Sequence, residues 1–179
     1  MIQEILLTED TIQTRIRELG EEIVRDHPRG AEIHLVGVLK GGFMFLSDLV
    51  RAMEANVTLD FMAVSSYGKG TKSSGEVRVL KDLDSSLEGR HVVIVEDIVD
   101  TGLTLKYMQE ILHARGPKTL KTACLLSKPS RRKITVPVEY IGFEIDDKFV
   151  VGYGLDFAEQ FRHLPYIGVL KAPDGAEPE

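Results

Sequence analysis

Residues 92–104 read V-V-I-V-E-D-I-V-D-T-G-L-T, a pattern typical of a strand that leads through an acidic turn into a helix. The strand is indicated by the apolar, mostly β-branched residues at 92–95. After the turn, Leu105, Met108 and Leu112 recur at helical spacing on one face. Because ligands gather at the carboxyl ends of strands in a parallel α/β sheet, we expect a binding site at this turn.

The turn offers two kinds of binding group. Backbone N–H groups at the start of a helix suit a phosphate, the hydroxyls of Thr101 and Thr104 add donors, and Gly102 permits a close approach. Glu96 and Asp97 are acceptors that suit sugar hydroxyls or a hydrated Mg²⁺. These residues predict a site for a phosphorylated sugar. An ordinary strand–helix turn with an acidic first turn explains the same local pattern, so the local residues leave both interpretations open.

The composition limits the possible classes of protein. The chain has 179 residues, 43% hydrophobic and 28% charged, with a net charge of −6. This balance is typical of one globular domain and argues against nucleic acid held on a basic surface. No apolar run approaches the ~20 residues that span a bilayer, and residues 1–10 lack the features of a signal peptide. We expect a cytoplasmic protein without a membrane partner, in which the single Cys124 is a buried side chain rather than a nucleophile.

Periodic patterns predict the remaining elements. A helix begins after Thr8 and ends before His27, and a second helix covers 43–53. Further strands are predicted at residues 33–39, 57–65, 76–80, 120–126, 138–143 and 167–170. Strands that alternate with helices indicate an α/β fold with a parallel sheet of about five strands. We expect a single domain over residues 1–170 and a disordered tail over 171–179.

Three other segments carry residues that could bind or cover a ligand. Lys40, Gly41 and Gly42 stand between a strand and a helix, and they form either a second anion site or a plain turn. Residues 66–75 form a polar, glycine-rich loop that is either a flexible linker or a lid over a reactive sugar. Lys128 follows a strand end, where it is either a ligand donor or a surface lysine.

Residues 92–104 resemble the phosphoribosyl pyrophosphate signature of the type I phosphoribosyltransferases. The acidic pair after an apolar strand and the D-T-G-x-T ending carry the resemblance. The order of motifs up to about residue 170 is most similar to the bacterial hypoxanthine-guanine branch of that family. The resemblance implies a mostly parallel sheet flanked by helices, a small hood built from the termini, and a mobile lid loop.

The resemblance also implies a reaction. The 5-phosphoribosyl group passes from phosphoribosyl pyrophosphate to N9 of a 6-oxopurine base, hypoxanthine or guanine, in purine salvage. IMP or GMP and pyrophosphate are the products. Mg²⁺ is the implied cofactor, and a homodimer or homotetramer is the implied assembly.

Residue roles follow from the matched positions. The catalytic residue is Asp100, which would accept the proton of purine N7. The phosphoribose-binding residues are Glu96, Asp97, Asp100, Thr101, Gly102, Leu103 and Thr104. The pyrophosphate-binding residues are Lys40, Gly41, Gly42 and Arg162, with a cis peptide expected between Leu39 and Lys40. The purine-binding residues are Lys128, which would donate to O6, Phe149, Val150 and Asp156. The lid residues are Ser66 and Tyr67, and the Mg²⁺ ligands are Glu96, Asp97 and Asp156.

Several alternatives stay open. A core position explains Phe149 as well as a stacking role does. Arg131 and Arg132 suit either a subunit interface or solvent. The chain could also be a regulator that binds phosphoribosyl pyrophosphate together with RNA or DNA, although its acidic balance argues against this. A relative that prefers xanthine or adenine is the nearest alternative among enzymes.

Overall fold

The computed structural model describes residues 1–66 and 77–171. Ser66 is the last residue of a strand, whereas Tyr67 and the rest of the expected lid lie outside the described residues. The expected tail also lies outside them, apart from Lys171. Within the described ranges, no helix combines the length and apolar character needed to cross a bilayer.

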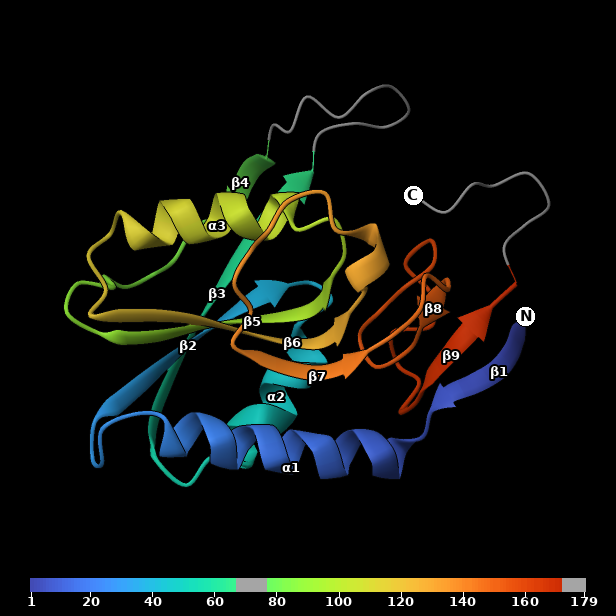
Figure 1. Cartoon of the computed structure of the whole chain (residues 1–179), viewed down its shortest axis with the longest axis horizontal. Helices are drawn as coiled ribbons and strands as arrows, with labels where there is room; N and C mark the ends of the chain where they lie inside the picture. Colours follow the sequence, from blue (N-terminus) through green and yellow to red (C-terminus); the bar gives the residue numbers. More distant parts are fainter. Residues whose placement is uncertain (67–76, 172–179) are drawn as a thin grey trace.

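A six-stranded sheet forms the centre of the molecule (Figure 1). Its strand order is β4-β3-β2-β5-β6-β7. The strands are β2 (Glu32–Leu39), β3 (Asn56–Ser66), β4 (Val77–Lys81), β5 (His91–Val99), β6 (Thr119–Ser127) and β7 (Tyr140–Glu144). All neighbours run parallel except β4, which is antiparallel to β3. The parallel part therefore has the five strands that the sequence predicts.

Helices cover both faces of the sheet. The helix α1 (Glu9–Arg25) and the helix α2 (Phe43–Arg51) lie on one face, and α3 (Leu103–His113) lies on the other (Figure 1). Thr8 caps α1 as predicted, since its hydroxyl accepts a hydrogen bond from Thr11 N at 3.2 Å. Successive residues of β5 alternate between two cores, because Val93 packs with the α1 and α2 side and Val92 packs with the α3 side.

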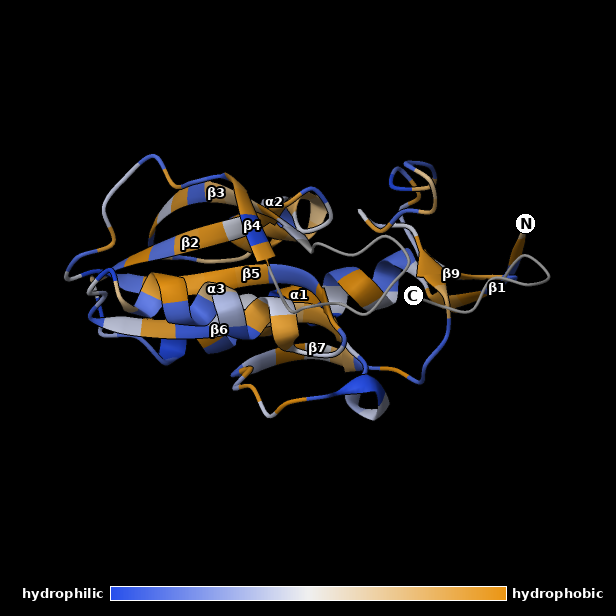
Figure 2. Cartoon of the chain, turned by 90° about the horizontal axis from the view of Figure 1, so that it is seen from above, coloured by the Kyte–Doolittle hydropathy of each residue, from blue (hydrophilic) through white to orange (hydrophobic). Residues whose placement is uncertain are grey.

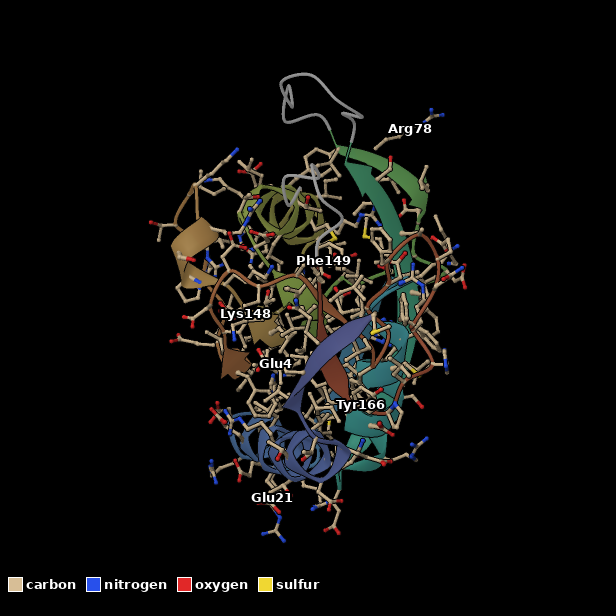
Figure 3. The ribbon with its side chains drawn as sticks, turned by 90° about the vertical axis from the view of Figure 1, so that its right-hand side faces the viewer. Glu4, Glu21, Arg78, Lys148, Phe149 and Tyr166 are labelled. Carbon is tan, nitrogen blue, oxygen red and sulfur yellow. The ribbon has the colours of Figure 1, made fainter. Side chains whose placement is uncertain are left out.

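The termini form a small separate sheet. It has the antiparallel order β1-β9-β8, built from β1 (Ile2–Leu7), β8 (Val150–Val151) and β9 (Ile167–Leu170). Figure 3 faces this side of the molecule and shows Lys148 close to Glu4 of β1, in agreement with an ion pair of 2.9 Å. The hood expected from the termini is therefore confirmed.

The central strand is longer than the sequence pattern suggests. We expected the strand to end at Val95 and an acidic turn to follow, but β5 continues to Val99. Glu96 pairs with Cys124 of β6 and Val99 pairs with Ser127, so Glu96 and Asp97 belong to the strand itself. Figure 2 shows β5 changing from hydrophobic to hydrophilic toward its carboxyl end. The acidic pair is thus held by sheet hydrogen bonds rather than by a loop.

Candidate active site

A cavity of about 480 Å³ lies at the carboxyl ends of β2 and β5. Six of the seven residues predicted to bind phosphoribose line it: Glu96, Asp97, Asp100, Thr101, Gly102 and Thr104. Gly41, Asp156 and Arg162 also line the cavity, although Arg162 is more than 50 positions from β5 in the sequence. Leu103 does not line it and is the first residue of α3. The structure therefore brings most of the predicted polar site together.

The acidic pair is unusual because it is withdrawn from water. Glu96 is 8% exposed, and Asp97 is partly buried. Burial, and then the neighbouring Asp97 carboxylate, raise the pKa of Glu96 well above its ordinary value. Burial also raises the pKa of Asp97, against the hydrogen bond that its Oδ1 accepts from Ile98 N at 2.8 Å. Two adjacent buried carboxyl groups are acceptors in need of donors, and sugar hydroxyls or a cation would supply what the pair lacks.

The glycine pair after β2 shapes the wall beside these acids. Gly41 lies directly against the Asp97 carboxylate, so that a Cβ at position 41 would overlap the Asp97 oxygen. The peptide between Leu39 and Lys40 is cis, which confirms the expectation drawn from the resemblance. Gly42 is the residue that precedes α2.

The start of α3 has the features of an anion site. Gly102 precedes the helix with a φ of 86°, a left-handed conformation that favours glycine. No side chain caps this end of α3. Leu103 N donates a hydrogen bond to the Thr101 hydroxyl at 3.4 Å, and Thr104 faces the cavity from the first turn. The other backbone N–H groups of this turn can bind a phosphate.

Asp100 stands at the edge of the cavity and is held by two residues that sequence reasoning left undecided. Its Oδ1 accepts from Arg131 Nε at 2.7 Å, and its backbone oxygen accepts from Arg132 Nη1 at 2.7 Å. Both arginines come from the segment after β6, about 30 positions along the chain, and no local pattern around Asp100 points to them.

Of the four residues predicted to bind the purine, Asp156 lines the cavity, whereas Lys128, Phe149 and Val150 do not. Lys128 is 7% exposed, and its Nζ lies 3.5 Å from Asp147 Oδ1. Phe149 is partly buried and packs edge-on against Phe157, with ring centroids 5.5 Å apart. Val150 is buried in β8. Lys128 is not the surface lysine that its residue type favours, because it is withdrawn from solvent beside the Asp147 carboxylate.

Two cations predicted to bind pyrophosphate meet at one glutamate. Glu159 accepts from Lys40 Nζ at 3.0 Å and lies 3.4 Å from Arg162 Nη2. Arg162 also donates to the backbone oxygen of Gly154 at 2.7 Å, and its Nε is buried without a partner in the described part of the chain. Arg162 lines the cavity, and its planar guanidinium suits anionic oxygens. Glu159 has no role predicted from the sequence, because an acidic residue in a loop carries no signal of one.

The donors present fit a Mg²⁺ ion bound together with its substrate. Glu96, Asp97 and Asp156 all line the cavity, and burial raises the pKa of the first two. A bound cation would favour the ionised form of both groups. In the described residues, no three His, Cys, Asp or Glu side chains converge closely enough to hold a metal by themselves. Mg²⁺ commonly takes one or two carboxylates and completes its shell with water and substrate phosphates.

The single cysteine of the chain is a buried side chain, as the sequence predicts. Cys124 is fully buried in β6, and burial raises the pKa of its thiol to about 12. A thiol of this kind is not activated as a nucleophile.

Comparisons with known proteins give consistent results. A sequence model of the phosphoribosyl transferase domain matches residues 3–158. The chain is 51% identical over 174 residues to a hypoxanthine-guanine phosphoribosyltransferase of Dictyostelium discoideum, covering 96% of this chain and 97% of that protein. It is 51% identical over 166 residues to a hypoxanthine phosphoribosyltransferase of Escherichia coli, covering 92% and 93%. The crystal structure of a hypoxanthine phosphoribosyltransferase from Staphylococcus aureus matches with a TM-score of 0.91 and 49% identity, covering 95% of this chain and 92% of that one.

Proposed function

The chain belongs to the phosphoribosyltransferase family, among its hypoxanthine-guanine members, and we propose that it transfers a 5-phosphoribosyl group from phosphoribosyl pyrophosphate to N9 of hypoxanthine or guanine. The products are IMP or GMP and pyrophosphate. The reaction is a step of purine salvage, and the enzyme is a pentosyltransferase.

One observation carries the proposal. Glu96, which is buried, and Asp97, which is partly buried, share a cavity with the start of α3, so acceptors for a ribose diol stand beside donors for a phosphate. The family's substrate carries both groups on one molecule. An ordinary strand–helix turn does not require its carboxylates to be buried.

The chemistry follows from where charge develops. Departure of pyrophosphate builds positive charge on the ribose ring, and the carboxylates of Glu96 and Asp97 would stabilise that charge. Asp100 accepts the proton from N7 as N9 bonds to the sugar, which is general-base catalysis. Residues 101–104 hold the 5-phosphate through the backbone at the start of α3.

The leaving group requires positive charge. Lys40 and Arg162 bind the pyrophosphate, with Gly41 and Gly42 providing backbone contacts at close range. We propose that Glu96, Asp97 and Asp156 hold Mg²⁺, which when bound offsets the charge on the pyrophosphate. Before the substrate arrives, Glu159 pairs with the two cations.

The purine lies beyond the cavity, toward Lys128. Lys128 donates to O6, Phe149 packs on the ring, and the backbone of Val150 reads the base edge. A lysine donor selects a 6-oxo group over a 6-amino group, because the oxo group accepts a hydrogen bond from the ammonium and the amino group, itself a donor, does not. We further propose one domain over residues 1–170 that assembles as a homodimer or homotetramer in the cytoplasm.

Pyrophosphate release with four bases tests the function. Purified protein is assayed with phosphoribosyl pyrophosphate, Mg²⁺ and hypoxanthine, guanine, xanthine or adenine in turn. Release with hypoxanthine or guanine at least about tenfold faster than with adenine is expected from recognition of O6. Release with adenine or xanthine alone would contradict the proposed base preference. No release with any base, together with tight nucleic-acid binding at physiological salt, would indicate a regulator instead.

A further inference from the structure

Two consecutive arginines hold Asp100, one by its side chain and one by its backbone. Arg131 Nε donates to Asp100 Oδ1 at 2.7 Å, and Arg132 Nη1 donates to the Asp100 backbone oxygen at 2.7 Å. The Arg131 and Asp100 side chains are 23% and 30% exposed, so the pair is partly shielded from water. A single residue of the site thus receives hydrogen bonds from two adjacent guanidinium groups.

Arg131 and Arg132 contact different kinds of groups and have different roles. Arg132 also donates to Val99 O at 2.9 Å and to the Ser127 hydroxyl at 2.7 Å, so it joins the ends of β5 and β6. Backbone hydrogen bonds reinforce this junction, including Lys128 N to Val99 O at 3.0 Å. Arg131 contacts no backbone oxygen through its side chain in the described residues, and its partners are carboxylates. Arg132 therefore has a structural role, whereas the role of Arg131 concerns charged side chains.

Arg131 is part of a row of alternating charges. Its Nη1 lies 3.5 Å from Asp147 Oδ2, and the other oxygen of Asp147 lies 3.5 Å from Lys128 Nζ. The row therefore runs Lys128, Asp147, Arg131, Asp100. In the proposed function, the residues at its two ends bind neighbouring atoms of the purine. Lys128 binds O6, and Asp100 binds N7. O6 and N7 lie next to each other on one edge of the ring system, so the row connects two residues that would bind the same edge of the base.

We propose that Arg131 is a positioning residue that orients the Asp100 carboxylate for the proton of N7. Oδ1 is held by the guanidinium, whereas Oδ2 accepts no hydrogen bond from any described residue and is left to face the base. Arginine suits this role because its guanidinium is planar, stays charged and donates in fixed directions. The proposal rests on the proposed function, since it assigns no role to Arg131 unless Asp100 acts on a purine.

A double-mutant cycle on positions 131 and 100 tests the proposal. R131A is expected to lower kcat with hypoxanthine about 10- to 100-fold, because a misplaced catalytic group is costly, while KM for phosphoribosyl pyrophosphate stays within about twofold. R131K, which restores one charged donor, is expected to recover part of kcat. In the D100N background, R131A is expected to change kcat less than about twofold, because the group that Arg131 orients is already disabled.

A matched control separates this role from a general loss of stability. Arg115 forms a comparable pair with Asp82, at 2.7 and 2.9 Å, and neither residue lines the cavity. R115A is expected to leave kcat unchanged, and thermal unfolding of each variant confirms that it is folded at the assay temperature.

The outcomes are distinct. Wild-type protein that is inactive with every purine base would refute the proposed function, and this proposal with it. An active wild type in which R131A lowers kcat equally in both backgrounds would overturn the positioning role alone. The same conclusion would follow if R131A raised KM for phosphoribosyl pyrophosphate and left kcat unchanged.

Discussion

Gly41 and Asp97 are in contact across the wall of the cavity, and the carboxylate of Asp97 occupies the space that a side chain at position 41 would need. The two residues lie at the ends of neighbouring parallel strands, β2 and β5. The position of the acid therefore depends on the absence of a Cβ at Gly41, in the turn that follows the neighbouring strand β2. The contact explains in steric terms why a glycine is needed after Lys40.

Substitution of Gly41 by alanine should displace Asp97. Because the added Cβ overlaps the carboxylate, either the side chain or the loop must move, and a shift of about 1 Å in a catalytic group typically costs about 100-fold in rate. We expect G41A to lower kcat/KM for phosphoribosyl pyrophosphate about 100-fold while the protein remains folded. Steady-state kinetics and circular dichroism provide the two measurements.

Gly30 provides the control for the loss of a glycine. It has a φ of 79° and nothing near the position of its missing Cβ, so alanine there strains the backbone without touching the cavity. G30A should lower the free energy of unfolding by about 1 kcal/mol and leave kcat/KM unchanged. Equal kinetic losses in G30A and G41A would show that the contact with Asp97 is not the cause.

Replacement of Asp100 by asparagine should separate turnover from binding. Asparagine preserves the size of the side chain and loses the basic carboxylate, and a general base is worth about 10²- to 10⁴-fold in rate. We expect D100N to lower kcat within that range while KM for both substrates changes less than about threefold. A variant with normal turnover would remove Asp100 from the mechanism.

Lys128 should control the choice between 6-oxo and 6-amino purines. K128M keeps most of the buried stem and removes the donor, and a hydrogen bond to a charged group is worth about 1.5–3 kcal/mol. We expect KM for hypoxanthine to rise about 10- to 100-fold and the preference over adenine to shrink. Competition between the two bases in one reaction measures the preference, and an unchanged ratio would argue that another group reads O6.

Asp60 should make the free energy of unfolding depend on pH in the acidic range. Burial raises the pKa of its carboxyl group, but backbone N–H groups of Phe61, Asp84 and Ser85, at 2.7, 2.9 and 3.2 Å, outweigh burial and set the pKa below its ordinary value. The unfolded chain then binds more protons than the folded chain. The stabilisation is thus complete above the ordinary pKa of 3.8 and is lost as pH falls through the lower folded value.

Thermal unfolding as a function of pH measures this effect. D60N should cost about 1–3 kcal/mol near pH 7, because the turn at 84–85 loses a charged acceptor. It should also have a shallower decline of Tm below pH 4 than the wild type. D84N is the matched control, since the Asp84 side chain is 85% exposed and should have little effect. Parallel declines of Tm in D60N and wild type would contradict the linkage.

The sequence predicted those helices and strands in which the buried residues recur at a regular spacing along the chain. The helical spacing of Leu105, Met108 and Leu112 matches three buried positions of α3. The apolar runs at 33–39 and 92–95 are buried strands for the same reason. The strands β1 and β8 of the hood have no such signal, because no residue of β1 is fully buried and β8 has only two residues.

The site was predicted less completely, for physical reasons. Glutamate and aspartate are poor strand formers, so the sequence suggested a turn at Glu96, whereas pairing with β6 overrides that local preference. The partners of Asp100 come from a segment about 30 positions away, and spacing along the chain says nothing of such a contact. Residue roles taken from the family resemblance stay predictions until the variants above are measured.

The two sides of the cavity are secured to different degrees. Glu96 lies in a central strand with hydrogen-bonded neighbours on both sides of that strand, whereas Asp156 and Arg162 lie in a segment held by isolated bridges, with positive φ values at Ala158, Glu159 and Phe161. We expect the amide of Glu96 to exchange hydrogen only through global unfolding, and the amides around Asp156 to exchange through local opening. Heating should therefore release a bound anion well before the fold itself is lost.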